Sequence, residues 1–139
     1  MHELFEHKAD TGIRGTGNSY EEAFAECARS MCQAMADVNK IGAKEHEKLD
    51  LETKDLEELL VAFLNHLLYL KDVKGTFYNK FDLYITNVGG KWQLKGTAHG
   101  EKIDRKKHRA KGEVKAVTYH QLKVEKKGEE YLVQCVVDV

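Results

Sequence analysis

The sequence predicts an α+β fold in one domain spanning residues 1–139, with an antiparallel sheet packed against two helices. Two segments whose apolar residues recur three and four positions apart both lie in the first half of the chain. Segments that alternate with a period of two dominate the second half, and a Gly-Gly pair separates two of them. Helices and strands segregated in this way are typical of α+β folds.

The first segment with strand character covers residues 3–8. Residues 11–18 contain three glycines, which predict a tight loop or a bulged second strand, and they match no phosphate-binding pattern. Ser19, with Glu22 three positions later, forms a capping box that opens a helix reaching about Asp37. The methionine-rich apolar stripe of this helix is interpreted as core rather than as a groove for a partner.

The alternation around Leu49 and Leu51 predicts a half-buried strand. Asp55, followed by Glu58, marks the start of a second helix. Its apolar stripe is wide enough for a central position in the core, and its members are Leu56, Leu59, Leu60, Phe63, Leu64, Leu67 and Leu68.

After Gly75 the apolar period changes to two, and Gly89-Gly90 is a typical two-residue hairpin turn. A third strand of this half is expected from about Val114 to Glu125. The last strand runs from Tyr131 to Asp138, with Val133, Cys135 and Val137 on one face.

The composition bears on location and partners. The chain has 22 basic and 23 acidic residues, so no global field draws it to nucleic acid or to a membrane, and any contact with RNA would need a local patch. No apolar run has the length of a membrane span, and the N-terminus lacks the apolar stretch of a signal peptide, so we expect a cytoplasmic protein. Cys27, Cys32 and Cys135 fit no zinc-binding spacing and are expected to be buried.

Acidic groups occur near both ends of the chain. Asp10 follows His7-Lys8-Ala9, and Asp138 precedes the terminal carboxylate of Val139. If the first and last strands are neighbours, these three oxygen groups would suit a hard cation such as Ca²⁺ or Mg²⁺. The residues alone leave open the alternative of a turn aspartate and a solvated chain end.

Three blocks in order, His7 to Phe24, Lys115 to His120 and Val137-Asp138-Val139, resemble the archease family over nearly the whole chain. Archeases are small α+β proteins that assist the RtcB-type RNA ligase, which joins tRNA exon halves. The resemblance implies an activator that is not itself an enzyme and that promotes GTP-dependent guanylylation and multiple turnover of the ligase. A second role known in the family is that of a chaperone-like modulator of a tRNA methyltransferase.

The resemblance also implies a metal site. Asp10 and Asp138 match positions of the family motifs, with the Val139 carboxylate as a third ligand and calcium as the expected ion, magnesium or manganese being the alternatives. Asp55 matches a further acidic position, but its role at the start of a helix explains it equally well, so it is a weak candidate. Lys8 departs from the family pattern, and its charge would weaken metal binding.

Two histidines and a basic run remain. His7 and His120 lie in the motif blocks and would carry protons or, as we favour, position the loop near Asp10. No nucleophile–base pair is legible, which argues against a hydrolase. The run from Arg105 to Lys111 would contact phosphates or an acidic protein, or would form a solvated connection between strands.

Overall fold

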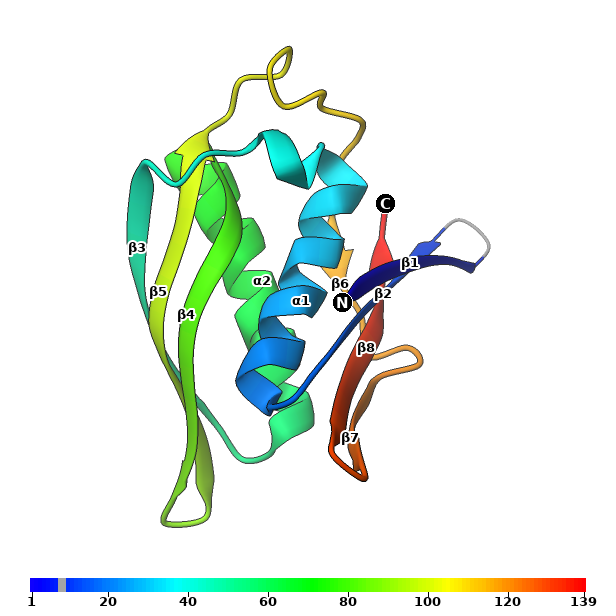
Figure 1. The fold of residues 1–139 in the computed structure, drawn as a ribbon, viewed down its shortest axis with the longest axis vertical. Coiled ribbons are helices and arrows are strands. Elements are labelled where there is room, and N and C mark those ends of the chain that lie inside the picture. Colours follow the sequence, from blue (N-terminus) through cyan, green and yellow to red (C-terminus); the bar gives the residue numbers. More distant parts are fainter. Residues whose placement is uncertain (8–9) are drawn as a thin grey trace.

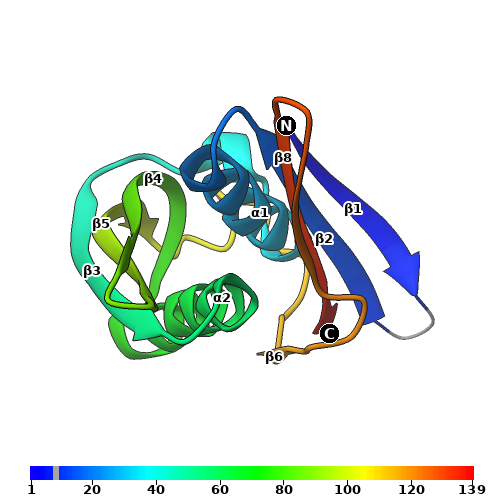
Figure 2. The ribbon, with the colours of Figure 1, turned by 90° about the horizontal axis from the view of Figure 1, so that it is seen from below.

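Two antiparallel sheets face each other across a layer of two helices (Figure 1). The computed structural model describes residues 1–7 and 10–139, with residues 5–7 described by their backbone alone. The order of the layers is clearest along the helix axes, where both helices lie between the sheets (Figure 2). The predicted α+β class is confirmed, although the strands form two sheets instead of the one expected.

The larger sheet has the order β1–β2–β8–β6, and β7 also pairs with β8. Its strands are β1 (His2–His7), β2 (Asp10–Gly17), β6 (Ala116–Val117), β7 (Lys123–Lys127) and β8 (Glu130–Asp138). The smaller sheet has the order β3–β5–β4, formed by β3 (Glu45–Thr53), β4 (Thr76–Val88) and β5 (Lys91–Lys102). The helices are α1 (Tyr20–Met35), α2 (Leu56–Lys74) and the short 3₁₀ helix η1 (Val38–Lys40).

Helix α1 begins as the capping motif predicts. The Ser19 hydroxyl accepts a hydrogen bond from the Glu22 backbone N–H at 3.1 Å, while the Glu22 carboxylate accepts one from the N–H of Asn18 at 3.3 Å. The helix ends at Met35, slightly before the predicted end, because Asp37 instead caps the 3₁₀ helix η1.

Helix α2 has a cap at each end. The Asp55 carboxylate accepts from the Glu58 N–H at 2.8 Å, and Gly75 adopts the left-handed conformation (φ 60°) that ends many helices. Neither helix in the described part of the chain has the length and hydropathy needed to cross a lipid bilayer.

Both sheets contribute to one apolar core. Ile13 and Cys135 enter it from the larger sheet, and Leu49 and Leu94 enter it from the smaller one. The expectation of buried cysteines is confirmed for all three. Burial raises the pKa of the Cys32 thiol to about 12, and burial together with a hydrogen bond to Cys135 raises the pKa of Cys27. The Cys27 and Cys32 thiols therefore stay protonated and unreactive at neutral pH.

Two predictions for the strands need correction. The second strand expected within residues 11–18 is present as β2, but it has no bulge, because it pairs with β8 in continuous register from Asp10–Asp138 to Gly17–Tyr131. The single strand expected over residues 114–125 is instead the short β6, a turn and then β7. Both the backbone N–H and the hydroxyl of Thr118 donate to the Val136 carbonyl of β8, and the chain then turns through Gln121, which has positive φ (52°).

The predicted hairpin at Gly89-Gly90 is confirmed, and both glycines have positive φ, 60° and 83°. The half-buried strand around Leu49 is also confirmed, as β3. No local pattern indicates the bulge in β4 at Asn79, whose side-chain amide donates to the carbonyls of Val38 and Ile41.

Gly15 determines how closely α1 approaches the larger sheet. A Cβ at this position would overlap the carbonyl oxygen of Ala23 and the backbone nitrogen of Cys27, both in α1. We expect Gly15→Ala to destabilise the protein by about 3 kcal/mol, since backbone atoms cannot move aside without shifting the helix. Urea denaturation measures this, with Gly112→Ala as the control because a Cβ there meets open space. Equal stability of the two variants would contradict the expectation.

Candidate metal site

The two predicted acidic side chains lie on adjacent strands at directly opposed positions. Asp10 begins β2, Asp138 ends β8, and the two are register partners. Opposed residues of an antiparallel pair place their Cβ atoms about 5 Å apart on one face of the sheet. Strand pairing therefore brings together carboxylates from the two ends of the chain.

These carboxylates face away from the helices. Ile13 and its register partner Cys135 are both fully buried in the core, and side chains alternate along each strand. Asp10 and Asp138 consequently share the outer face with the pair Arg14–Gln134, in which Arg14 Nε donates to Gln134 Oε1 at 3.0 Å.

In the described part of the chain, the acid pair takes part in no ion pair. Asp10 is half-buried and Asp138 is exposed. Arg14, on the same face of the sheet, forms its ion pair with Glu3 at 2.7 Å. Val139, whose carboxylate is the third expected ligand, follows Asp138 directly. Such groups suit Ca²⁺ or Mg²⁺, with water completing the coordination.

Strand β6 supports this corner from the other side. Ala116 is a register partner of Asp138, and the Lys115 N–H donates to the Asp138 carbonyl at 2.7 Å. The next residue, Val117, donates its N–H to Asn65 Oδ1 of α2 at 3.2 Å. The three sequence blocks that suggested the site thus meet at β2, β6 and β8.

Asp55 does not join the pair. It caps the N-terminus of α2, whereas β6 contacts α2 at Asn65, ten residues or about 15 Å further along the helix. In the described residues, no three His, Cys, Asp or Glu side chains converge in a way that would hold a metal ion. The candidate site therefore consists of two aspartates and the chain terminus.

The other residues singled out in the motif blocks are His7, Lys8 and His120. The backbone of His7 is the register partner of Asp10, but the His7 side chain and the whole of Lys8 lie outside the described residues. His120 is exposed in the turn that follows β6, where its N–H donates to Thr118 Oγ1 at 3.2 Å.

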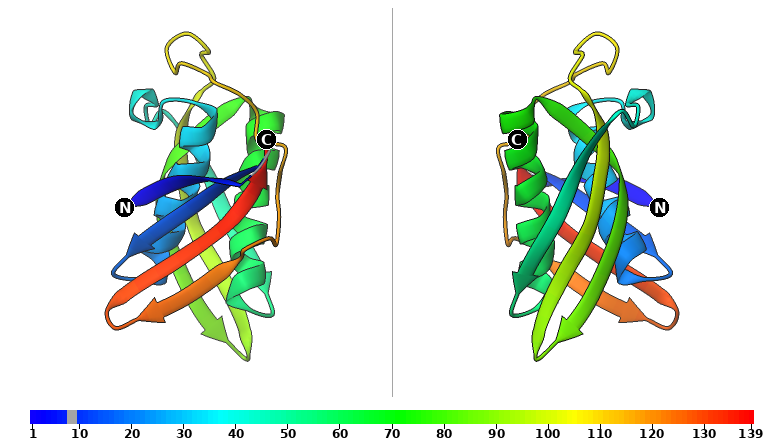
Figure 3. Two further views of the ribbon diagram at one scale, coloured as in Figure 1. Left: turned by 90° about the vertical axis from the view of Figure 1, so that its right-hand side faces the viewer. Right: turned by 90° about the vertical axis from the view of Figure 1, so that its left-hand side faces the viewer.

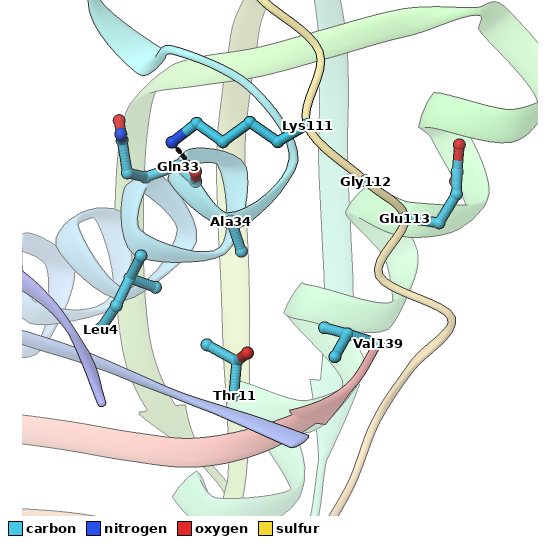
Figure 4. A pocket seen from close by; sticks show the side chains of 8 residues that line it. All are labelled: Leu4, Thr11, Gln33, Ala34, Lys111, Gly112, Glu113 and Val139. Atoms are coloured by element: carbon cyan, nitrogen blue, oxygen red, sulfur yellow. Dashed lines mark hydrogen bonds between the residues drawn. The ribbon is translucent and has the colours of Figure 1, made fainter. Parts of the chain in front are cut away.

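A cavity of about 600 Å³ opens on the inner side of the same corner (Figure 4). The sheet, the C-terminal end of α1 and the segment after the basic run form its walls. The lining residues are Leu4, Thr11, Gln33, Ala34, Lys111, Gly112, Glu113 and Val139. Val139 belongs to both features, since it lines the cavity and carries the terminal carboxylate of the candidate site.

The basic run is an exposed connection between β5 and β6, as one of the two interpretations expects, but one buried residue anchors it. Its residue His108 is fully buried, accepts the Asp104 N–H at Nδ1 (3.1 Å) and contacts Glu101 Oε1 through Nε2 at 2.8 Å. These two bonds define a neutral tautomer with the proton on Nε2. Sequence reasoning missed this anchor because a histidine among five cations suggests an exposed segment.

Glu101 is the acceptor on which the anchor depends. Lys107 Nζ donates to both carboxylate oxygens, at 2.9 and 2.8 Å, and the Gly42 N–H donates at 2.9 Å. Lys107 first, then Gly42 and His108, hold the pKa of the Glu101 carboxyl well below its usual range.

The end of the run and the segment after it are fixed to both helices. Lys111 Nζ donates to the Gln33 carbonyl of α1 at 3.0 Å. The buried Lys71 of α2 donates to Glu113 at 2.9 Å, and this contact lowers the Glu113 pKa. Arg105, Lys107 and Lys111 thus all have partners within the protein, and fewer charges of the run remain for phosphate binding.

Comparison with known proteins identifies the relatives of this chain. Residues 2–139 match the family model described as "Archease protein family (MTH1598/TM1083)". The protein archease of Pyrococcus furiosus is 43% identical over 138 residues, covering 99% of this chain and 97% of the relative. That of Sulfurisphaera tokodaii is 39% identical over 137 residues, with the same coverage.

Solved structures agree in fold. The solution structure of Methanobacterium thermoautotrophicum protein 1598 has a TM-score of 0.85 at 30% identity, covering 99% of this chain and 98% of that one. A crystal structure from Thermotoga maritima, described as an archease and possible chaperone, has a TM-score of 0.62 at 27% identity, covering 100% and 98%.

The Glu101 anchor makes stability depend on pH. Since the carboxyl pKa is lower in the folded than in the unfolded chain, its contribution is complete at neutral pH. That contribution is lost as the pH falls below about 4.3, the usual value for glutamate. We expect Glu101→Gln to lower the melting temperature by several degrees at pH 7, and the difference from the native protein to shrink towards pH 3.

Thermal melts followed by circular dichroism over this pH range measure the effect. Glu129→Gln, at an exposed position, is the control and should follow the native curve throughout. A Glu101→Gln deficit that stays constant with pH would contradict the assignment.

Proposed function

The chain belongs to the archease family, and on that basis we propose that it is a protein cofactor that activates an RtcB-type RNA ligase in tRNA splicing. It promotes the GTP-dependent guanylylation of the ligase and its multiple turnover. It is an accessory protein, not an enzyme, and it acts in the cytoplasm.

The observation that carries this proposal is the direct pairing of Asp10 with Asp138 beside the chain terminus. Repulsion between close carboxylates disfavours such an arrangement unless a cation offsets the charge. We infer that Asp10, Asp138 and the Val139 carboxylate bind a divalent ion, with calcium expected and magnesium or manganese as alternatives. When bound, this ion would supply positive charge near the triphosphate and the attacking histidine of the ligase.

The surface around the acid pair suits contact with a protein. The acid pair lies on the outer face of the corner, and the cavity lined by Leu4, Ala34 and Val139 opens on its inner face. A protruding loop of the ligase would contact both features together. The proposal requires no RNA at this contact.

A chaperone-like role towards a tRNA methyltransferase is the second candidate function. The Thermotoga maritima protein is described as a possible chaperone. Exposed Tyr69 and Val73 on α2, which are 59% and 58% accessible, would serve such a role and would not require a metal.

Calcium binding at the acid pair predicts a gain in stability. We expect saturating Ca²⁺ to raise the free energy of unfolding of the native protein by about 2 kcal/mol, since a ligand that binds only the folded state stabilises it. The Asp10→Asn/Asp138→Asn variant should show no gain and should be at least as stable as the native protein in EDTA. Urea denaturation with and without Ca²⁺ measures this, with Asp50→Asn on β3 as the control. A gain in the double variant would contradict the assignment.

The activating role is tested by guanylylation of a cognate RNA ligase under multiple-turnover conditions. We expect the native protein and Asp50→Asn to stimulate turnover, and the Asp10→Asn/Asp138→Asn variant to lose at least ten-fold of the stimulation, because the added charge near the triphosphate is gone. Equal stimulation by all three would retain the partnership and reject the metal mechanism. No stimulation by any would favour the chaperone-like role.

A further inference from the structure

A second cluster with ligand chemistry lies on the opposite side of the molecule. His46 of β3 and His99 of β5 are register partners in the smaller sheet. Side chains alternate along β3, and Leu49, three positions after His46, is buried. His46 and its register partner His99 therefore both face outwards. This outer face is turned towards the viewer in the right-hand view of Figure 3.

The two imidazoles face each other through the same type of nitrogen. His46 Nδ1 lies 2.6 Å from His99 Nδ1, and the ring planes are inclined by 79°. Asp82 of β4 places Oδ2 2.7 Å from His99 Nε2. The carboxylate accepts a hydrogen bond from the Nε2–H of His99. A neutral His99 therefore presents its Nδ1 lone pair to His46.

From this geometry we propose that His46 and His99 form a binding site for a divalent transition-metal ion such as Zn²⁺, Ni²⁺ or Cu²⁺. The two Nδ1 atoms are the ligands, and Asp82 is a positioning residue that orients His99. A carboxylate on the far nitrogen of a metal-binding imidazole fixes its tautomer and strengthens it as a ligand.

The distances fit the proposal. With metal–nitrogen bonds of about 2.05 Å, two ligands of one tetrahedral ion lie about 3.3 Å apart, and about 2.9 Å apart at right angles. A small rotation of the exposed His46 ring provides the difference from 2.6 Å. In the metal-free protein a proton occupies the space between the nitrogens. When the ion binds, that proton leaves His46 Nδ1 and His46 takes up a proton on Nε2, so the imidazole stays neutral and no net proton is released.

The donor atoms determine which ions bind. Imidazole nitrogen suits zinc, nickel and copper, whereas the oxygen groups of Asp10 and Asp138 suit calcium and magnesium. In the described residues no third ligand joins the two histidines, so water or a partner's side chain completes the coordination. Lys80, the register partner of His99, is exposed beside the site, and Asp82 forms its ion pair with His99.

Titration calorimetry of the tag-free protein with Zn²⁺, in excess Mg²⁺ to occupy the oxygen groups, tests the site. We expect one ion per chain, a loss of at least ten-fold in affinity for His46→Gln and for His99→Gln, and a loss of about ten-fold for Asp82→Asn. His66→Gln, a histidine on α2, is the matched control and should bind as the native protein does.

A second measurement separates ligation from a change in folding. Electron paramagnetic resonance of the Cu²⁺-loaded protein should show coupling to two imidazole nitrogens in the native protein and to one in either single histidine variant, while circular dichroism stays unchanged. Zinc affinity that is unaffected in His46→Gln and His99→Gln would overturn the proposal. So would a loss of binding in His66→Gln equal to theirs.

Discussion

The antiparallel pairing of β2 with β8 is the contact on which the rest of the larger sheet depends. It joins residues 10–17 to residues 131–138, and β6 and β7 also pair with β8, so three strands are placed by the last one. The acid pair exists only because this register is kept. A shift of one residue would turn Asp138 towards the helices and bring an apolar neighbour outwards. Contacts between distant parts of a chain carry a large entropic cost, so close packing against α1 at Gly15 helps to maintain the register.

Buried polar contacts hold the loop between β5 and β6 in place, as strand pairing holds the larger sheet. Between β5 and β6 the chain crosses the ends of both helices (Figure 1), and Glu101, His108 and Lys71 hold it there. Each of these buried polar groups has a partner, as a buried group requires. The loop therefore forms a fixed wall for the cavity beside Val139, and the shape of this corner is determined before any partner binds.

Local signals in the sequence predicted the local structure. Capping residues and apolar periodicity located both helices, and Gly89-Gly90 located the β4–β5 turn, because these features depend on near neighbours. Asp10 and Asp138 come together only if the first and last strands pair, and apolar periodicity does not predict which strands pair. The family resemblance was the reason to expect this contact. The division into two sheets, the buried His108 and the opposed His46 and His99 had no local signal, since each depends on register between distant strands.

The fold separates two kinds of donor atom. Oxygen groups gather where the larger sheet ends, and imidazole nitrogens gather on the outer face of the smaller sheet, with the helical layer between them (Figure 2). No side chain is shared between the two clusters. A hard cation and a transition-metal ion would therefore bind without competing for ligands, and each would stabilise a different sheet. Both sheets pack against the same two helices and share one core. An ion bound to either sheet would therefore stabilise this core against unfolding.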